Sequence, residues 1–174
     1  MIRDILAPNL KVIFVGYNPG RASEALGHHF AGPGNYFWAL IYDAGLTSHR
    51  LTPMEDGLLP YFGLGITNLV DRMTPGSADL DEVEMRVGGE RLHRKLLEFR
   101  PRATAFLGKD LYRSYRALTK SQPVGWGLQE FCTVPAMWDV VLPNPSRRST
   151  IAYDQRLRYF KELAGLLEYG LGKP

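Results

Sequence analysis

The sequence predicts an α/β fold, a three-layer α/β/α sandwich with a mainly parallel central sheet of about five strands. Short apolar runs such as LKVIFVG at 10–16 end in glycine and lack a two-residue alternation, which is typical of strands buried on both faces. Stretches with helical periodicity separate these runs, as in a parallel sheet built by helical crossovers. The chain has 174 residues and 45% hydrophobic content, so we expect residues 1–174 to form a single domain around one core.

Five stretches are predicted to be strands. The run at 10–16 is the first, and GLGITNLV at 63–70 and ATAFLG at 103–108 repeat its apolar character. Two further runs, LQEFCTVP at 128–135 and AMWDVVLP at 136–143, complete the expected sheet.

The segments between these strands are predicted to be one long loop and several helices. A Gly/Pro/Asn-rich stretch over 17–34 is expected to be a loop, after which helical spacing predicts a helix from Phe37 that Gly45 closes. Further helices are expected at 109–118 and 151–168. The last of them carries an apolar stripe made of Tyr153, Leu157, Phe160, Ala164 and Leu167.

The region from 77 to 99 is predicted to hold two helices. A capping pattern at Ser77 opens the first one near 79–87. Its inward face is expected to hold Leu80, Val83 and Val87. The pair Gly88 and Gly89 is expected to interrupt this helix, because glycine is a poor helix former. The inward face of the second helix is expected to hold Leu92, Leu96 and Phe99.

Composition excludes several classes of protein. No run approaches the roughly 18 apolar residues of a membrane span, and the start MIRDILAPNL lacks the features of a secretory signal, so we expect a cytoplasmic, bacterial-type protein associated with the nucleoid in use. The single cysteine, Cys132, excludes an internal disulfide and a four-cysteine metal site, and its apolar neighbours predict that it is buried. His28 and His29 are adjacent and point apart, so neither a metal nor a cofactor is expected.

Charge is distributed unevenly along the chain. The net charge is only +3, but residues 71–90 carry six carboxylates against two arginines. Residues 91–120 reverse this balance with nine basic residues against two acidic ones, and 143–161 adds five against one. Such segregation, with an isoelectric point near 9.0, is compatible with nucleic-acid binding, although charge runs are also common on solvated helix faces.

Polar side chains follow the predicted strands at the points where the strands end. The carboxyl ends of parallel strands meet at one edge of a sheet, and sites in such folds lie there. The residues placed at this edge are Tyr17-Asn18-Pro19-Gly20, Thr67-Asn68, Gly108-Lys109 and Asn144-Pro145-Ser146.

None of these turns pairs a nucleophile with a base, and the chain has no G-x-S-x-G elbow, Walker lysine loop or G-x-G-x-x-G fingerprint. The amide of Asn18 cannot usefully take up a proton, but it can orient a water and accept a hydrogen bond from it. That help suffices for a reaction whose transition state already carries positive charge, such as glycosidic cleavage through an oxocarbenium ion. A simple turn is the alternative, since Asn-Pro and Pro-Gly are strong turn signals.

Five ordered segments of the chain resemble one known family. They are GYNPG, HHFAGPGNYFW, GITNLVDRMTP, AFLGK and LPNPSRRS, and the resemblance extends from about Ile5 to Leu167. In order and spacing they resemble the mismatch-specific uracil/thymine-DNA glycosylases of the uracil-DNA glycosylase superfamily. The resemblance implies a monofunctional enzyme of base-excision repair, which flips uracil or a related pyrimidine out of duplex DNA and hydrolyses its N-glycosidic bond, with a preference for G·U mismatches.

The resemblance also assigns roles to residues of the expected site. By that similarity Asn18 is the catalytic residue that positions the attacking water. Phe30 looks like the aromatic on which the flipped base stacks, and the backbone of Tyr17 is expected along the base edge, with its ring helping to close the pocket. Ser23 lies where the family narrows the pocket near C5 of the pyrimidine. Asn144 corresponds to a residue near the base and sugar.

The turn after the last strand is expected to contact DNA. Ser146 is predicted to bind phosphate through its hydroxyl and N–H groups, and Ser149 lies in the same turn. Bacterial members of the family have a small residue and then a leucine wedge where this chain has Arg147 and Arg148. Arg148 is expected to insert into the duplex and Arg147 to neutralise phosphate, which leaves open the dependence on an opposite guanine. Lys109 is a further phosphate candidate, and a solvated first-turn lysine is the alternative.

Asn68 is a second departure from the bacterial mismatch-specific pattern, which often has lysine there. The segment ITNLV resembles other branches of the superfamily, in which an asparagine reads the Watson–Crick edge of uracil. An amide can donate to O4 and accept from N3–H, which selects uracil against cytosine. Asp71 is a candidate for a stronger base, but a salt bridge with Arg72 or a loop cap is the favoured interpretation.

Two other classes of function stay open. A non-catalytic lesion-binding module fits a site without a strong base. A small-nucleotide hydrolase rests on fold-level analogy alone, and the sequence from Ser146 to Arg148 counts against it. The glycosylase is the favoured hypothesis, with double-stranded DNA containing a flipped base as partner, no membrane, and a monomer as the expected state.

Overall fold

The computed structural model describes residues 2–119 and 121–170 and is built around a five-stranded sheet. The strands are β1 (Val12–Gly16), β2 (Leu64–Asn68), β3 (Ala103–Phe106), β4 (Gly127–Leu128) and β5 (Trp138–Val141). Their order is β2-β1-β3-β5-β4, and every pairing is parallel except that of β4 with β5. The predicted α/β class with a mainly parallel sheet of about five strands is confirmed.

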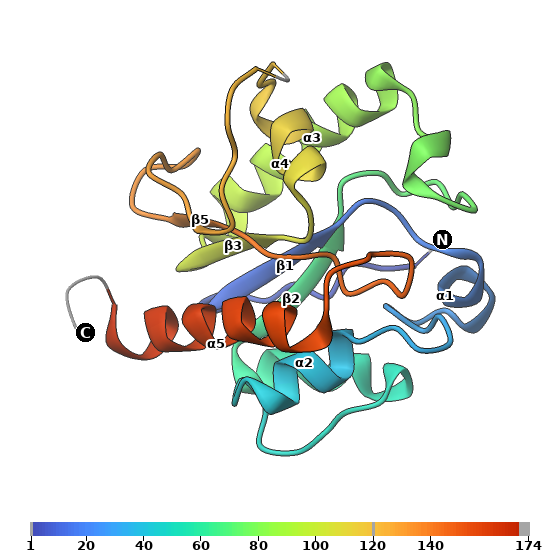
Figure 1. Cartoon of the computed structure of the whole chain (residues 1–174), viewed down its shortest axis with the longest axis vertical. Coiled ribbons are helices and arrows are strands. Elements are labelled where there is room, and N and C mark those ends of the chain that lie inside the picture. Colours follow the sequence, from blue (N-terminus) through green and yellow to red (C-terminus); the bar gives the residue numbers. More distant parts are fainter. Residues whose placement is uncertain (1, 120, 171–174) are drawn as a thin grey trace.

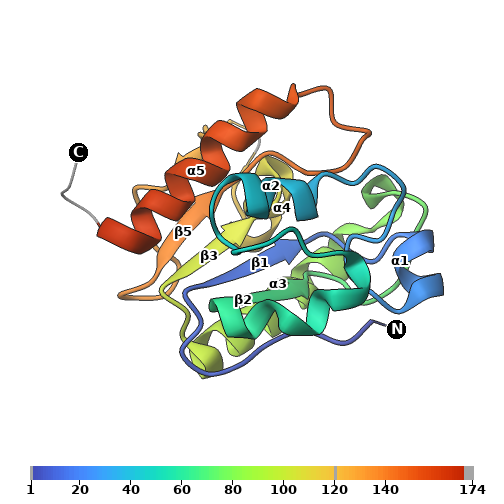
Figure 2. The same cartoon turned by 90° about the horizontal axis from the view of Figure 1, so that it is seen from below.

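Helices cover both faces of this sheet. They are α1 (Arg21–Leu26), α2 (Phe37–Asp43), α3 (Glu82–Phe99), α4 (Lys109–Arg116) and α5 (Tyr153–Tyr169), together with the 3-10 segments η1 (Pro53–Phe62) and η2 (Ser77–Asp79). Figures 1 and 2 show α2 and α5 on one face, α3 and α4 on the other, and α1 beyond the carboxyl end of β1. Within the described ranges, no helix is both long and apolar enough to cross a membrane.

Successive side chains of β1 pack into two separate hydrophobic cores, one on each face of the sheet. Val12 and Phe14 pack with α2 and α5, whereas Ile13 and Val15 pack with α3 and α4. All four side chains are fully buried. Burial on both faces is the reason why the strand shows no alternation of apolar and polar residues.

The helix α3 differs from the prediction because it runs unbroken through Gly88 and Gly89. A Cβ atom at Gly88 would lie 2.1 Å from the carbonyl oxygen of Leu69, so glycine is needed for α3 to approach the chain that leaves β2. Tertiary packing thereby outweighs the weak helix propensity of glycine. The predicted inward face of the first half is also wrong, since the side chains of Val83 and Val87 are 60% and 49% exposed.

Two segments around the sheet also differ from the prediction. The predicted loop over 17–34 contains α1, and the strand predicted at 128–135 shrinks to the two residues of β4. Beyond β4 the chain folds around the buried carboxylate of Asp139, whose Oδ2 accepts a hydrogen bond from the backbone N–H of Thr133 at 3.0 Å. Cys132 lies in this loop and is exposed, contrary to the prediction.

Candidate functional site

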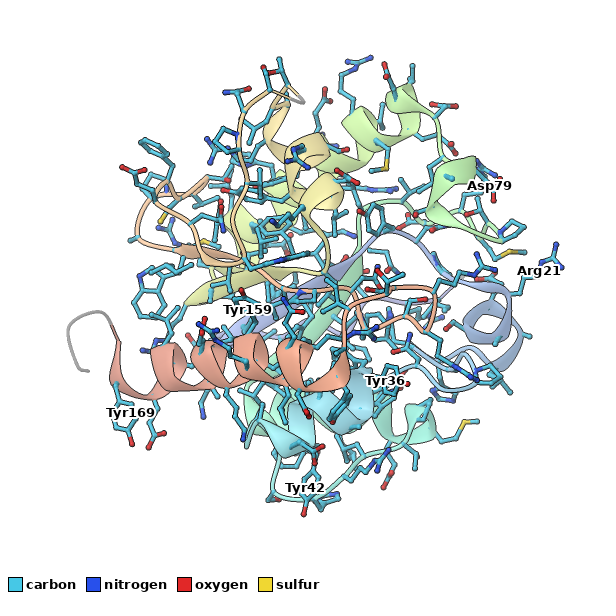
Figure 3. All side chains as sticks on the ribbon, in the orientation of Figure 1. Arg21, Tyr36, Tyr42, Asp79, Tyr159 and Tyr169 are labelled. Atoms are coloured by element: carbon cyan, nitrogen blue, oxygen red, sulfur yellow. The ribbon has the colours of Figure 1, made fainter. Side chains whose placement is uncertain are left out.

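A cavity of about 680 Å³ opens at the carboxyl ends of the strands. It brings together turns that are far apart in sequence, as the parallel topology requires. Its wall contains the predicted residues Tyr17, Asn18, Ser23, Phe30, Asn68, Asn144, Ser146, Arg147, Arg148 and Ser149. In Figure 3, the labelled residues Arg21 and Asp79 mark the end of the molecule where the loops of this cavity lie.

The side chain of Asn18 is held by the segment that follows β2. Its Nδ2 donates to the carbonyl oxygen of Arg72 at 2.9 Å and to Oγ1 of Thr74 at 2.6 Å. Both amide hydrogens are therefore used, and Oδ1 remains as the acceptor on a residue that lines the cavity. Sequence reasoning missed Thr74, because its link to Asn18 spans 56 positions.

Phe30 offers a flat aromatic surface to the cavity. Its ring stacks on that of Phe37, with centroids 4.2 Å apart and an angle of 24° between the planes. The backbone of Phe30 has φ of 51°, in the left-handed region that a bulky residue rarely adopts. This conformation requires support from the surrounding structure.

That support comes from hydrogen bonds to the residues on either side of Phe30. The backbone N–H of His29 donates to Oδ2 of Asp56 in η1 at 3.0 Å. The backbone N–H of Ala31 donates to Oγ of Ser23 in α1, also at 3.0 Å. Ser23 thus supports the aromatic ring as well as lining the cavity, and Asp56 is a contributor that the sequence did not reveal.

Asn68 and Phe30 approach each other across the end of β1. A Cβ atom at Gly16 would lie 2.6 Å from Oδ1 of Asn68 and 3.7 Å from the ring of Phe30, so a larger residue there would displace the Asn68 amide. Asn68 is 8% exposed, and its amide makes no hydrogen bond to another side chain or backbone group that the structure describes. Both poles of this amide are therefore available to a ligand in the cavity.

The ring of Tyr17 faces α4. Its hydroxyl oxygen accepts a hydrogen bond from the backbone N–H of Leu111 at 3.0 Å, and burial raises the pKa of this phenol to about 12. Gly108, with φ of 144°, makes room for the ring, because a Cβ atom there would lie 2.9 Å from the hydroxyl. Tyr17 therefore ties the first turn of the site to α4.

The second asparagine turn is stabilised by contacts within itself. Oδ1 of Asn144 accepts from the backbone N–H of Ser146 at 2.8 Å, and Oγ of Ser146 accepts from the backbone N–H of Arg148 at 3.2 Å. The backbone N–H of Ser149 donates a hydrogen bond to the carbonyl oxygen of Ser146 at 3.1 Å. Because Oδ1 of Asn144 is used within the turn, its Nδ2 remains as a donor for the cavity that the residue lines.

Arg156 of α5 supports this turn from behind and is 2% exposed. Its guanidinium donates to the carbonyl oxygens of Ser146, Ser149 and Ile151 at 3.2, 2.8 and 2.9 Å, and it lies over the ring of Tyr36. Desolvation lowers the pKa of Arg156. Its position four residues before Phe160, on the buried stripe of the helix, is the signal that could have revealed it.

The two arginines of the turn contact different segments of the chain. The side chain of Arg147 covers Gly34, where a Cβ atom would lie 2.3 Å from Cδ of the arginine. Nη1 of Arg148 donates to the carbonyl oxygen of Pro75 at 2.8 Å. Both arginines line the cavity, Arg147 against the loop at Gly34 and Arg148 against the loop at Pro75.

Lys109 and Asp71 lie outside the wall of the cavity. Nζ of Lys109 lies 4.5 Å from the ring centroid of Trp126, in a cation–π contact. Asp71 forms an ion pair with Arg91 at 2.7 Å, so the salt bridge predicted with Arg72 is wrong.

The electrostatic character of the cavity follows from its lining residues. Of the described residues in its wall, none is a carboxylate, whereas three are arginines. His29 does not supply a strong base either, because burial lowers its pKa and its Nε2–H donates to the carbonyl oxygen of Arg3 at 2.9 Å. Within the described part of the chain, no group of His, Cys, Asp and Glu could hold a metal ion.

These features define an α/β protein with an amide-lined cavity and a basic rim at the carboxyl edge of its sheet. Residues 4–168 match the family model of the Uracil DNA glycosylase superfamily, and the chain therefore belongs to that superfamily. Membership implies a DNA-binding hydrolase of base-excision repair that acts on uracil-type lesions.

Proposed function

We propose that the protein is a monofunctional DNA glycosylase of the mismatch-specific uracil/thymine type, which flips uracil out of duplex DNA, prefers G·U mismatches, and hydrolyses the N-glycosidic bond. The observation that carries this proposal is a cavity wall in which none of the described residues is a carboxylate and the Asn18 amide is fixed with its oxygen as the acceptor. Such a site supports a reaction in which the base leaves before water attacks.

The mechanism that fits these groups is dissociative. As the glycosidic bond breaks, negative charge develops on the departing uracil and positive charge on the sugar. Amide donors and the basic rim of the cavity stabilise the anionic base, and Oδ1 of Asn18 accepts a hydrogen bond from the water that attacks C1′. The amide need not remove a proton early, because the oxocarbenium ion is a strong electrophile.

Base recognition is proposed to rest on Phe30 and Asn68. The exposed face of the Phe30 ring stacks on the flipped pyrimidine, while its other face is supported by Phe37. The unpartnered amide of Asn68 donates to O4 and accepts from N3–H of uracil. Cytosine reverses the donor and acceptor pattern at these atoms and is disfavoured.

The turn from Ser146 to Ser149 is proposed to hold the distorted duplex. The hydroxyls of Ser146 and Ser149 and the guanidinium of Arg147 contact phosphate, and Arg148 inserts at the position that the base has left. Insertion requires Arg148 to give up its hydrogen bond to Pro75. The bond is replaced by stacking on the flanking bases.

A base-release panel on duplexes with U·G, U·A and T·G and on single-stranded uracil DNA tests the proposal. Wild type should release uracil fastest from U·G. Asn18→Ala should lower the single-turnover rate about 100-fold or more while binding to uracil-containing duplex persists. Gln155→Ala, an exposed amide on α5, is the matched control and should behave like wild type.

Other outcomes would assign a different function. Binding to abasic DNA without release of any base would identify a lesion-binding module, and hydrolysis of free nucleotides would identify a nucleotide hydrolase. Unchanged uracil excision by Asn68→Ala would contradict the recognition role of Asn68.

A further inference from the structure

The amide of Asn18 can be placed in two orientations that differ only by exchange of its oxygen and nitrogen. Only one of them leaves an acceptor for water in the cavity. The carbonyl oxygen of Arg72, 2.9 Å from Nδ2, favours this orientation, since a carbonyl can only accept. It is an exposed contact with a single backbone atom, however, so a second partner matters.

Thr74 is that second partner, and its hydroxyl is not free to rotate. The hydroxyl donates its one hydrogen to the carbonyl oxygen of Gly76 at 2.6 Å. Its oxygen can therefore only accept from Asn18, at 2.6 Å. Thr74 is 2% exposed, so solvent has little access to compete for either bond.

We propose that Thr74 is a positioning residue of the excision reaction, which fixes the Asn18 amide with its oxygen toward the attacking water. The inference rests on the proposed function. It assigns to Thr74 a contribution to rate that is separate from any contribution to stability. Without the hydroxyl, the Asn18 amide keeps a single partner and samples orientations that do not hold water productively.

The segment around Thr74 is held in a way that suits this role. The backbone N–H of Thr74 donates to the carbonyl oxygen of Pro19 at 3.3 Å, beside Asn18 itself. The backbone N–H of Gly76 donates to Oδ2 of Asp79 at 3.0 Å, so the acceptor of the Thr74 hydroxyl is anchored to η2. The hydroxyl therefore has little freedom to turn toward another acceptor.

Thr74→Val tests the proposal because it keeps the shape of the side chain and removes the hydroxyl. On a U·G duplex the single-turnover excision rate should fall about 10- to 100-fold, with unchanged affinity for abasic duplex. Thr74→Ser restores the hydroxyl and should recover most of the rate. Thr104→Val is the matched control, since Thr104 is fully buried and its Oγ1 has no partner in the described structure, so the rate should not change.

A double-mutant cycle separates positioning from a merely structural effect. If Thr74 acts through Asn18, then Thr74→Val should slow wild type but leave the residual rate of Asn18→Ala unchanged. An equal fractional loss in both backgrounds, or a wild-type rate in folded Thr74→Val, overturns the inference. Thermal unfolding confirms folding of each variant, and Thr74→Ala replaces the valine variant if that one is unfolded. Absence of base release by wild type would instead refute the proposed function.

Discussion

The two Asn-Pro turns of the cavity, at Asn18-Pro19 and Asn144-Pro145, share a dipeptide and differ in how their amides are held. Asn18 uses its nitrogen, and both partners lie more than 50 positions away, at Arg72 and Thr74. Asn144 uses its oxygen, and its partner is the backbone N–H of Ser146, two positions away. The same motif therefore presents opposite poles to the cavity.

This difference shows that the hydrogen bonds an asparagine makes to the protein decide whether its amide offers a donor or an acceptor to a ligand. At Asn18 the remaining pole is an acceptor, which suits a water molecule. At Asn144 it is a donor, which suits a carbonyl or phosphate oxygen of the substrate. The cavity therefore offers a hydrogen-bond acceptor at Asn18 and a donor at Asn144. The first can bind the water and the second can bind the nucleotide.

The largest expected effect comes from removing the buried support of the second turn. Arg156→Lys keeps the positive charge, but an ammonium cannot reach three carbonyl oxygens in the geometry of a guanidinium. The free energy of unfolding should fall by about 2 to 4 kcal/mol, since the buried side chain at 156 loses partly buried hydrogen bonds to these carbonyl oxygens. Urea unfolding measures this loss.

Hydrogen exchange measured by mass spectrometry locates the effect of Arg156→Lys. Exchange should speed up in 146–151 and stay unchanged in 17–20, because the first turn is held by other residues. Arg158→Lys is the control, since Arg158 lies on the same helix and is exposed. Equal loosening of both turns would show that they are not held independently.

A smaller effect is expected from replacing each amide by a carboxyl group. In Asn18→Asp an oxygen replaces Nδ2 and faces the carbonyl of Arg72, so the pKa of the new carboxyl should rise. At neutral pH this variant should lose about 1 to 2 kcal/mol of unfolding free energy. Asn144→Asp keeps its bond to the N–H of Ser146 and should stay within about 0.5 kcal/mol of wild type.

The stability of Asn18→Asp should depend on pH, and the raised pKa of the new carboxyl sets the direction of the change. A folded-state pKa above the unfolded value means that stability is fully present below the unfolded pKa, about 3.9, and is lost as pH rises through the folded pKa. Asn18→Asp should therefore approach wild-type stability near pH 4 and fall behind it at pH 7.5, as measured by urea unfolding at both. Similar losses at Asn18 and Asn144 would contradict the opposite-pole arrangement.

The comparison of the two turns also shows what the sequence could predict. The buried strands and the residues at their ends were predictable, because a parallel sheet places strand ends on one edge. All candidate site residues except Lys109 and Asp71 line the cavity. The local hydrogen bond of Asn144 follows from turn chemistry. The bonds of Asn18 to Arg72 and Thr74 do not, since they exist only after β1 and β2 are paired.

The failures of sequence-based prediction have the same physical origin. The pair Gly88 and Gly89 was expected to break a helix, but close contact with the carbonyl oxygen of Leu69 makes glycine necessary at position 88. Arg156 carries a charge within an apolar stripe, and only the folded turn supplies the carbonyl oxygens that bind it. Local propensity and hydropathy contain no information on such distant partners.

The smallest expected effect is a pH response confined to the Asn18 side of the cavity. The imidazole of His29 donates from Nε2 to the carbonyl oxygen of Arg3 and so helps to anchor the Phe30 loop. Burial lowers the pKa of His29, so the protonated imidazole is disfavoured in the folded protein. Its contribution to stability is present above the unfolded value of about 6.5 and is lost as pH falls below it. The second turn, residues 144–151, contains no group that titrates between about pH 5 and 8.

Acidification from pH 7.5 to 5.5 should therefore lower the excision rate a few-fold through a looser Phe30 loop, while the affinity for abasic duplex stays unchanged. His29→Gln should flatten this response, and His93→Gln, on α3, should retain it. An unchanged pH profile in His29→Gln would show that the Phe30 loop is held by Asp56 and Ser23 alone.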